Sequence, residues 1–213
     1  MEVFDYLRTL LQFTIGLITI LNPIAAAAIM VSLLTPPVSK RELVSISKKT
    51  TLTILTASLL STFLGDLIFK LFDINIHSIK VIGGIILLLF SINMIKGKIF
   101  EASHTPEEHE EAKEKDDISI IPLGIPILFG PGTFTTLVIF KTSTHNWIDL
   151  FILITAIFIS SVVVFLVFKN AVLLDKFLGI TGVKITTRIM GLIVGAIASQ
   201  FIVSGVKSLW DMY

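Results

Sequence analysis

Six long stretches of the chain carry almost no charge, and they constrain its fold more than any other feature. They are residues 9–39, 50–69, 81–95, 118–140, 150–168 and 189–206, and Asp66 is the one charged residue among them. A membrane-spanning helix needs about 20 mostly apolar residues. The useful part of the first stretch ends near Leu34, and Ile76 and Ile79 extend the short third one. The sequence therefore predicts an all-α membrane protein with six transmembrane helices.

Composition favours the same fold class. The 213 residues are 54% hydrophobic and 15% charged, whereas a soluble domain is about 45–50% apolar and about 25% charged. The net charge is +1, and no basic patch is long enough to bind nucleic acid. Because cysteine is absent, disulfides, thiolate metal sites and a cysteine nucleophile are excluded. The lipid bilayer is the partner we expect.

The lysines and arginines are distributed unequally between the two sides of the predicted bundle. Twelve of the 17 lie in the loops after the first, third and fifth spans, and five lie on the other side. Basic residues are enriched in cytoplasmic loops. We therefore expect a multi-pass protein of the cell (inner) membrane, with loops one, three and five in the cytoplasm and both termini outside.

One segment is plainly hydrophilic. Residues 101–117 contain eight acidic residues and two lysines, which is typical of a solvated linker. His104 and His109 lie among its glutamates, but a charged linker is a far commoner explanation than a weak metal site. We predict no metal and no cofactor. The linker separates a first segment, residues 1–100, from a second, residues 118–213.

The two segments share an internal repeat with an offset of 108 residues. Proline breaks occur at corresponding places, and residues of spans three and six match in the same register: Lys80 with Arg188, Gly83 with Gly191, Ser91 with Ser199, and Gly97 with Gly205. Glycine matches alone are common in membrane helices, because small residues line helix contacts. Each segment holds three spans, an odd number, so the second enters the membrane from the opposite side. The pattern predicts two inverted-topology repeats.

Proline interrupts the first span at Asn22-Pro23 and the fourth at Gly130-Pro131-Gly132. Proline inside a helix removes a backbone hydrogen bond, and the freed groups are tolerated in a membrane only where protein or water covers them. Asn or Gly as a cap, followed by Pro, restarts a helix near mid-membrane. Such a start attracts anions, and freed carbonyls attract an ammonium. A small zwitterion fits, although water, an ion or another polar solute fits too, and the prolines could also only bend helices for packing.

Polar residues inside the spans offer further candidates. Asp66 lies near the outer end of span two, where it could couple transport to a proton or cation, or only pair with Lys70 one turn away. Four polar residues could face the bundle interior, where hydrogen bonding between helices is their commoner role: Ser91, Asn93, Ser199 and Gln200.

The sequence contains no complete motif that is typical of catalysis. Leu64-Gly65-Asp66 is similar to part of the intramembrane aspartyl protease motif, but no second intramembrane aspartate accompanies it. The zinc-protease, serine-hydrolase and Walker motifs are absent. We therefore expect that the protein is not an enzyme.

Four pieces of the sequence resemble the MarC family of six-span bacterial and archaeal inner-membrane proteins. They occur in the family's order and spacing over essentially the whole chain, and the last is the most specific: LNPI at 21–24, GDLI at 65–68, KVIGGIIL at 80–87 and IPLGIPILFGPGTFTT at 121–136. The resemblance implies an inverted-repeat fold and, for at least some members, transport of small neutral amino acids such as glycine and alanine.

The resemblance also implies that the broken first and fourth spans hold the substrate. With two neighbours of the breaks, Ala26 and Thr136, the candidate site is Asn22, Pro23, Ile24, Ala25, Ala26, Gly130, Pro131, Gly132, Thr133 and Thr136. Many family members have Asp where this chain has Asn22, and Gly is frequent where this chain has Ala25. The first difference removes a possible charge at mid-membrane, and the second narrows the pocket.

The leading hypothesis is a secondary transporter of small neutral amino acids that works by alternating access, with H⁺ or Na⁺ as coupling ion. One alternative is a channel or facilitator for a small polar solute, in which the breaks line a pore. The other is a membrane scaffold that transports nothing.

Overall fold

The computed structural model describes residues 2–34, 38–97 and 118–212, apart from the side chains of Glu2, Val3 and Asp66, and this part of the chain is helical without any strand. In chain order the helices are α1 (Glu2–Leu21), α2 (Pro23–Leu33), α3 (Lys40–Leu71), α4 (Ile76–Lys96), η1 (Ser119–Leu128), α7 (Pro131–Thr142), α8 (Trp147–Lys169) and α9 (Ala171–Trp210). The prediction of an all-α protein is confirmed.

Five apolar segments of the described chain are long enough to cross a membrane, and a sixth is counted if a bent pair forms one span. One of the five, residues 4–33, runs through the α1–α2 junction. The bent pair is η1 and α7, which meet at 61°. These numbers agree with the six apolar stretches of the sequence. The acidic segment 101–117, with His104 and His109, lies outside the described residues.

Several helices extend beyond the apolar stretches that predicted them. α3 begins at Lys40 instead of Thr50, and α9 begins at Ala171 instead of Ile189. The helices extend further than the apolar stretches because charge marks the edge of the membrane and not the end of a helix, and Lys and Arg are good helix formers. The start of α3 is set by its N-cap, Ser39, whose hydroxyl accepts a hydrogen bond from the backbone N–H of Glu42 at 3.1 Å.

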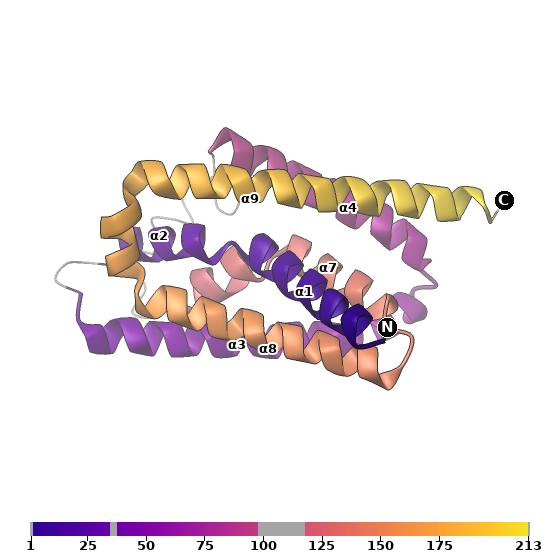
Figure 1. Ribbon diagram of the computed structural model, residues 1–213, viewed down its shortest axis with the longest axis horizontal. Coiled ribbons are helices and arrows are strands. Elements are labelled where there is room, and N and C mark those ends of the chain that lie inside the picture. Colours follow the sequence, from indigo (N-terminus) through magenta and orange to yellow (C-terminus); the bar gives the residue numbers. More distant parts are fainter. Residues whose placement is uncertain (1, 35–37, 98–117, 213) are drawn as a thin grey trace.

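The helices form three layers (Figure 1). α4 and α9 make one outer layer, α3 and α8 make the other, and α1, α2 and α7 lie between them. The middle layer is the core: 72% of the most apolar window of the α1–α2 segment is buried, against 29% for α3 and 28% for α9. The apolar faces left exposed on the outer layers are suited to lipid.

Contacts between the helices come in reciprocal sets. α1 packs on α8, whereas η1 packs on α3, and α2 packs on α9, whereas α7 packs on α4. Within the antiparallel α4–α9 pair, Gly97 lies against Arg188, and Gly205 lies against Lys80. Each of these two interfaces thus has a counterpart between the corresponding helices, whereas the packing of α1 on α9 has no counterpart of similar extent.

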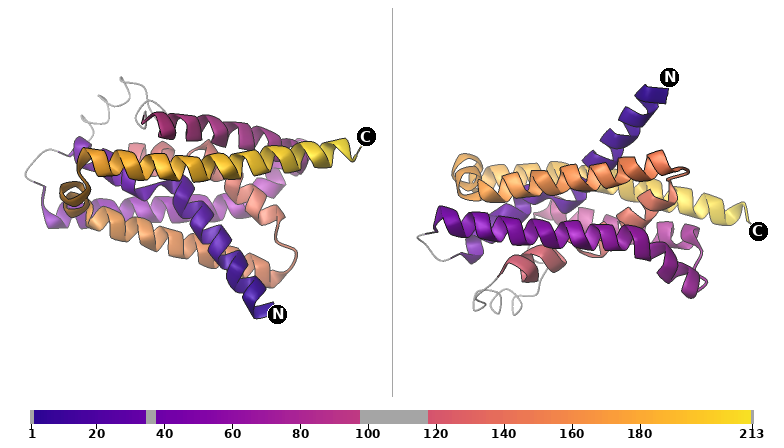
Figure 2. Two further views of the ribbon diagram at one scale, coloured as in Figure 1. Left: turned by 45° about the horizontal axis from the view of Figure 1, so that its top comes forward. Right: turned by 90° about the horizontal axis from the view of Figure 1, so that it is seen from below.

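The N-terminal half of α1 leaves the bundle. Figure 2 shows it projecting away from the other helices, with its end well separated from α9. Side chains on this part of α1 are exposed, including Phe4 at 80% and Leu7 at 51%. The α1–α2 segment is therefore deeply buried at its junction and loosely held at its N-terminal end.

Candidate functional site

The second proline break leaves a short extended joint between two helices. η1 ends at Leu128, Gly130 is extended with φ −99° and ψ −176°, and Pro131 is the first residue of α7. The first backbone hydrogen bond of α7 runs from Phe134 N–H to the Gly130 carbonyl, 3.1 Å. Since proline at the first helical position has no N–H to leave unpaired, the sequence restarts a helix here as its residues predict.

The start of α7 has backbone donors that lack acceptors. No side chain caps the helix, and within the described chain the N–H groups of Gly132 and Thr133 have no hydrogen-bond partner. The hydroxyl of Thr133 donates back across the break to the Leu128 carbonyl at 2.9 Å, and that of Thr136 donates to the Gly132 carbonyl at 2.8 Å. The hydroxyls therefore satisfy nearby carbonyls, while the amides remain available to a ligand.

A cavity of about 280 Å³ lies against this helix start. Its polar part consists of the break itself and the side chain of Asn93, from α4. Its apolar part comes from α1, α4 and η1: Ile20, Ile86, Leu89, Phe90, Pro126, Ile127 and Leu128. Among the described lining residues none is ionisable. The cavity can accept or donate hydrogen bonds, but it offers no fixed charge except the partial positive charge of the helix start.

Asn93 is the polar side chain of the cavity that does not belong to the break. It is half-buried, and its amide makes no hydrogen bond to the rest of the described chain. Two residues earlier, Ser91 is buried and donates to the Gly191 carbonyl of α9 at 2.8 Å. Ser91 thus has the helix-to-helix role that the sequence suggested for this group of polar residues, whereas Asn93 faces the cavity.

α3 fixes the approach to the second break. Its Thr50 hydroxyl donates to the Ser119 carbonyl at the start of η1, 2.8 Å away. Further along, a Cβ on Gly124 would lie 2.8 Å from the Thr53 methyl group, so only glycine fits there. These contacts hold η1, whose Pro122 and Pro126 both follow cis peptide bonds, against the long helix of the outer layer.

The first proline break is tighter. Asn22 joins α1 to α2 in the left-handed conformation, with φ 43° and ψ 60°, and Pro23 begins α2. Asn22, Pro23, Ala25 and Ala26 are buried. As at the second break, no side chain caps the helix start, and Ala26 N–H bonds the carbonyl of Asn22 at 3.1 Å.

The structure brings together one half of the predicted site. Gly130, Pro131, Gly132 and Thr133 all line the 280 Å³ cavity. The residues predicted around the first break do not line it, and Ile24 instead lines a cleft of about 10 Å³ against α9. Thr136 is buried one turn above the cavity. The first span contributes Ile20, two residues before Asn22, which no sequence pattern singled out.

Two further points concern ionisable groups. Asp66 lies within α3, but its side chain is outside the described part of the structure. No group of three or more His, Cys, Asp or Glu side chains suited to a metal ion occurs among the described residues. The chemistry of the described site therefore consists of neutral hydrogen-bonding groups.

Comparison with known proteins gives the family. Residues 7–210 match the model of a protein family that is described as "MarC family integral membrane protein". The chain is 38% identical over 206 residues to the UPF0056 membrane protein YvbG of Bacillus subtilis, which covers 93% of this chain and 94% of that protein. It is 36% identical over 192 residues to MJ1677 of Methanocaldococcus jannaschii, covering 90% and 93% of the two chains. No solved structure is significantly similar. The chain therefore belongs to the MarC family of integral membrane proteins.

Proposed function

We propose that this protein is a secondary transporter of small neutral amino acids such as glycine and alanine, and that substrate binds in the cavity at the second proline break. One observation carries the proposal. The unpaired N–H groups of Gly132 and Thr133 and the unpaired side-chain amide of Asn93 border the same cavity. A carboxylate would accept from the N–H groups, and the Asn93 oxygen would accept from an ammonium.

The size and polarity of the cavity favour a small solute. A volume of about 280 Å³ is at the lower limit of the roughly 300–1,000 Å³ of common ligand pockets. The apolar wall, which includes Ile20 and Phe90, suits a short aliphatic side chain better than a charged one. A drug-sized molecule would not be enclosed.

We also propose that the fold consists of two inverted repeats with broken first and fourth spans, so that one half moves against the other. The reciprocal packing of α1 on α8 and of η1 on α3 supports this. So do the first hydrogen bonds of α2 and α7, Ala26 to Asn22 and Phe134 to Gly130, whose residues are 108 apart in the sequence. We also propose that loops one, three and five lie in the cytoplasm. Transport would be driven by an H⁺ or Na⁺ gradient, and Asp66 is the candidate residue for coupling.

The test is transport by the purified protein in liposomes. We expect saturable uptake of radiolabelled glycine and alanine, with counterflow and with a response to an imposed H⁺ or Na⁺ gradient. Asn93→Ala removes a ligand for substrate and should weaken apparent affinity about tenfold, the effect of losing a hydrogen bond to a charged group. Asn170→Ala is the control, because its amide bonds only the Leu166 carbonyl on an exposed surface.

A second variant tests the position of the cavity. A Cβ on Gly132 would lie 2.9 Å from the Leu87 side chain, so Gly132→Ala should obstruct uptake, and adding Leu87→Val should restore part of it. No saturable uptake and no binding across a panel of small neutral amino acids would reject the substrate class. Flux that rises linearly with concentration, without counterflow, would favour a channel.

A further inference from the structure

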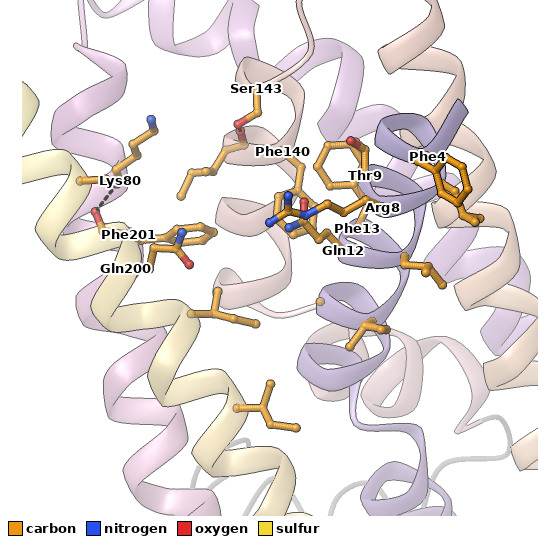
Figure 3. A pocket seen from close by; sticks show the side chains of 18 residues that line it. Phe4, Arg8, Thr9, Gln12, Phe13, Lys80, Phe140, Ser143, Gln200 and Phe201 are labelled. Carbon is orange, nitrogen blue, oxygen red and sulfur yellow. Dashed lines mark hydrogen bonds between the residues drawn. The ribbon is translucent and has the colours of Figure 1, made fainter. Parts of the chain in front are cut away.

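A second and larger cavity lies outside the proposed substrate site. It has a volume of about 980 Å³ and is bounded by α1, α7 and α9, with Lys80 contributed by α4 (Figure 3). Its lining residues on α1 run from Phe4 to Gly16, in the part of the helix that Figure 2 shows projecting from the bundle. It shares no lining residue with the cavity at the second break. Between the two, Ile20, Leu87 and Ile139 belong to one buried apolar cluster.

The charge of this groove is one-sided. Arg8 from α1 and Lys80 from α4 both line it, and no carboxylate does among the described residues. Neither cation makes an ion pair or hydrogen bond with any side chain that the structure describes. Gln12 and Gln200 add amide groups near the same end, and Figure 3 shows Arg8 and Gln12 extending from α1 toward α9. Two unneutralised cations at the edge of a membrane attract a phosphate.

The rest of the groove is mostly apolar, apart from the hydroxyls of Thr9, Ser143 and Ser204, and its length is that of one leaflet. Its walls include Phe13, Phe140 and Phe201, whose rings contact one another in series, with centroids 4.7 Å and 6.5 Å apart. Lining residues on α9 run from Ile193 to Ser204, a distance of about 16 Å at the helical rise of about 1.5 Å per residue. Half of a hydrocarbon core of about 30 Å is about 15 Å.

We infer that this groove binds one anionic phospholipid from the surrounding leaflet. The phosphate lies between Arg8 and Lys80, and an acyl chain follows the phenylalanine wall toward Ile193. The lateral opening between α1 and α9 admits the lipid from the bilayer. The bound lipid fills the groove and adds contacts to the N-terminal half of α1, whose Tyr6 and Leu10 already pack on the apolar cluster shared with α7 and α8.

Native mass spectrometry of the full-length purified protein tests the inference. The protein is titrated with phosphatidylglycerol or with phosphatidylcholine, and retained lipid is counted. We expect one preferentially bound phosphatidylglycerol. Arg8→Gln and Lys80→Gln should each weaken it about fivefold, from about 1 kcal/mol for each basic residue near an anionic surface. Lys207→Gln, which removes an exposed cation from α9 outside the groove, should change nothing.

A variant of the apolar wall separates the tail from the headgroup. Ile197→Trp fills the groove and leaves both cations in place, so it should also lower phosphatidylglycerol binding. Thermal unfolding of every variant identifies any that is misfolded. Equal retention of the two lipids, or equal loss in the Lys207 variant, would overturn the inference. If glycerol phosphate bound as tightly as the lipid, the groove would be a site for a free anion, and the inference would be overturned. A dimer that retains no lipid would overturn it too, because a second copy of the chain would then occupy the groove.

Discussion

At the scale of single residues, the two breaks differ although both are built from a cap and a proline. Gly130 is extended, a conformation that any residue adopts, and a Cβ there would lie 3.1 Å from the Pro126 carbonyl oxygen. Asn22 has φ 43°, in the left-handed region that asparagine tolerates better than most residues. The residue that can precede the proline is therefore restricted by the available space at the second break and by the backbone conformation at the first.

Substitution of Asn22 should reveal this backbone requirement. Asn22→Gly keeps the left-handed conformation accessible and should leave the free energy of unfolding within about 0.5 kcal/mol of the parent. Asn22→Ala should cost about 1–2 kcal/mol, because a Cβ is strained in this region. Chemical unfolding in detergent micelles measures both. Equal losses in the two variants would indicate that the asparagine side chain, and not its backbone, stabilises the junction.

At the residue level, a sequence can suggest a site only where its residues are neighbours along the chain. Gly130 to Thr133 could be selected because a proline break and its flanking glycines are adjacent. Asn93 could not be preferred over Ser91, because two residues apart on a helix point in nearly opposite directions and both are polar. Which of them faces α9 and which faces the cavity depends on how α4 is rotated in the bundle.

At the scale of elements, the α4–α9 pair is the most extensive helix contact in the described structure, and it depends on missing side chains. A Cβ on Gly84 would lie 2.8 Å from the Ala198 carbonyl oxygen, and one on Gly205 would lie 2.8 Å from that of His77. Since lipid supplies no hydrophobic drive between helices, close backbone approach of this kind is what holds a membrane pair together.

Gly84→Ala should therefore separate these two helices. The added carbon meets a backbone oxygen that cannot move by changing rotamer, so we expect a loss of about 1–3 kcal/mol in unfolding free energy. Gly182→Ala is a suitable control, because its Cβ would meet only the side chain of Leu178 on the same helix. If both substitutions were neutral, the closeness of α4 and α9 would have no role in stability.

At the scale of the whole molecule, the number of apolar spans followed from the sequence, but the ends of the helices did not. Charge-free stretches locate the membrane, whereas α3 continues past it to Lys40, and α9 continues past it through Arg188 and Lys184 toward its kink at Gly179. The three-layer arrangement depends on long-range packing that no local pattern encodes. The 108-residue offset stays a prediction: Gly97 lies near Arg188 and Gly205 near Lys80, but Gly83 and Gly191, a further matched pair, have different neighbours.

Orientation in the membrane can be tested with single cysteines, because the chain contains none. Ser45→Cys lies on an exposed position of α3 near the first loop, and His145→Cys is exposed between α7 and α8. The charge distribution predicts that a membrane-impermeant maleimide added to intact cells labels His145→Cys and not Ser45→Cys. The reverse pattern would invert the topology, and labelling of both only after lysis would contradict an external α7–α8 loop.

The helix starts that no side chain caps have one more consequence. Backbone amides inside a membrane helix exchange their protons with solvent very slowly when they are hydrogen-bonded. The amides of Gly132 and Thr133 border a cavity and have no acceptor within the described chain, whereas those of Ile24 and Ala25 start a helix within the packed middle layer. Deuterium uptake by these two pairs of amides therefore measures how readily water reaches the start of each half-helix. It follows the hydration of the two breaks separately and needs no label or substitution.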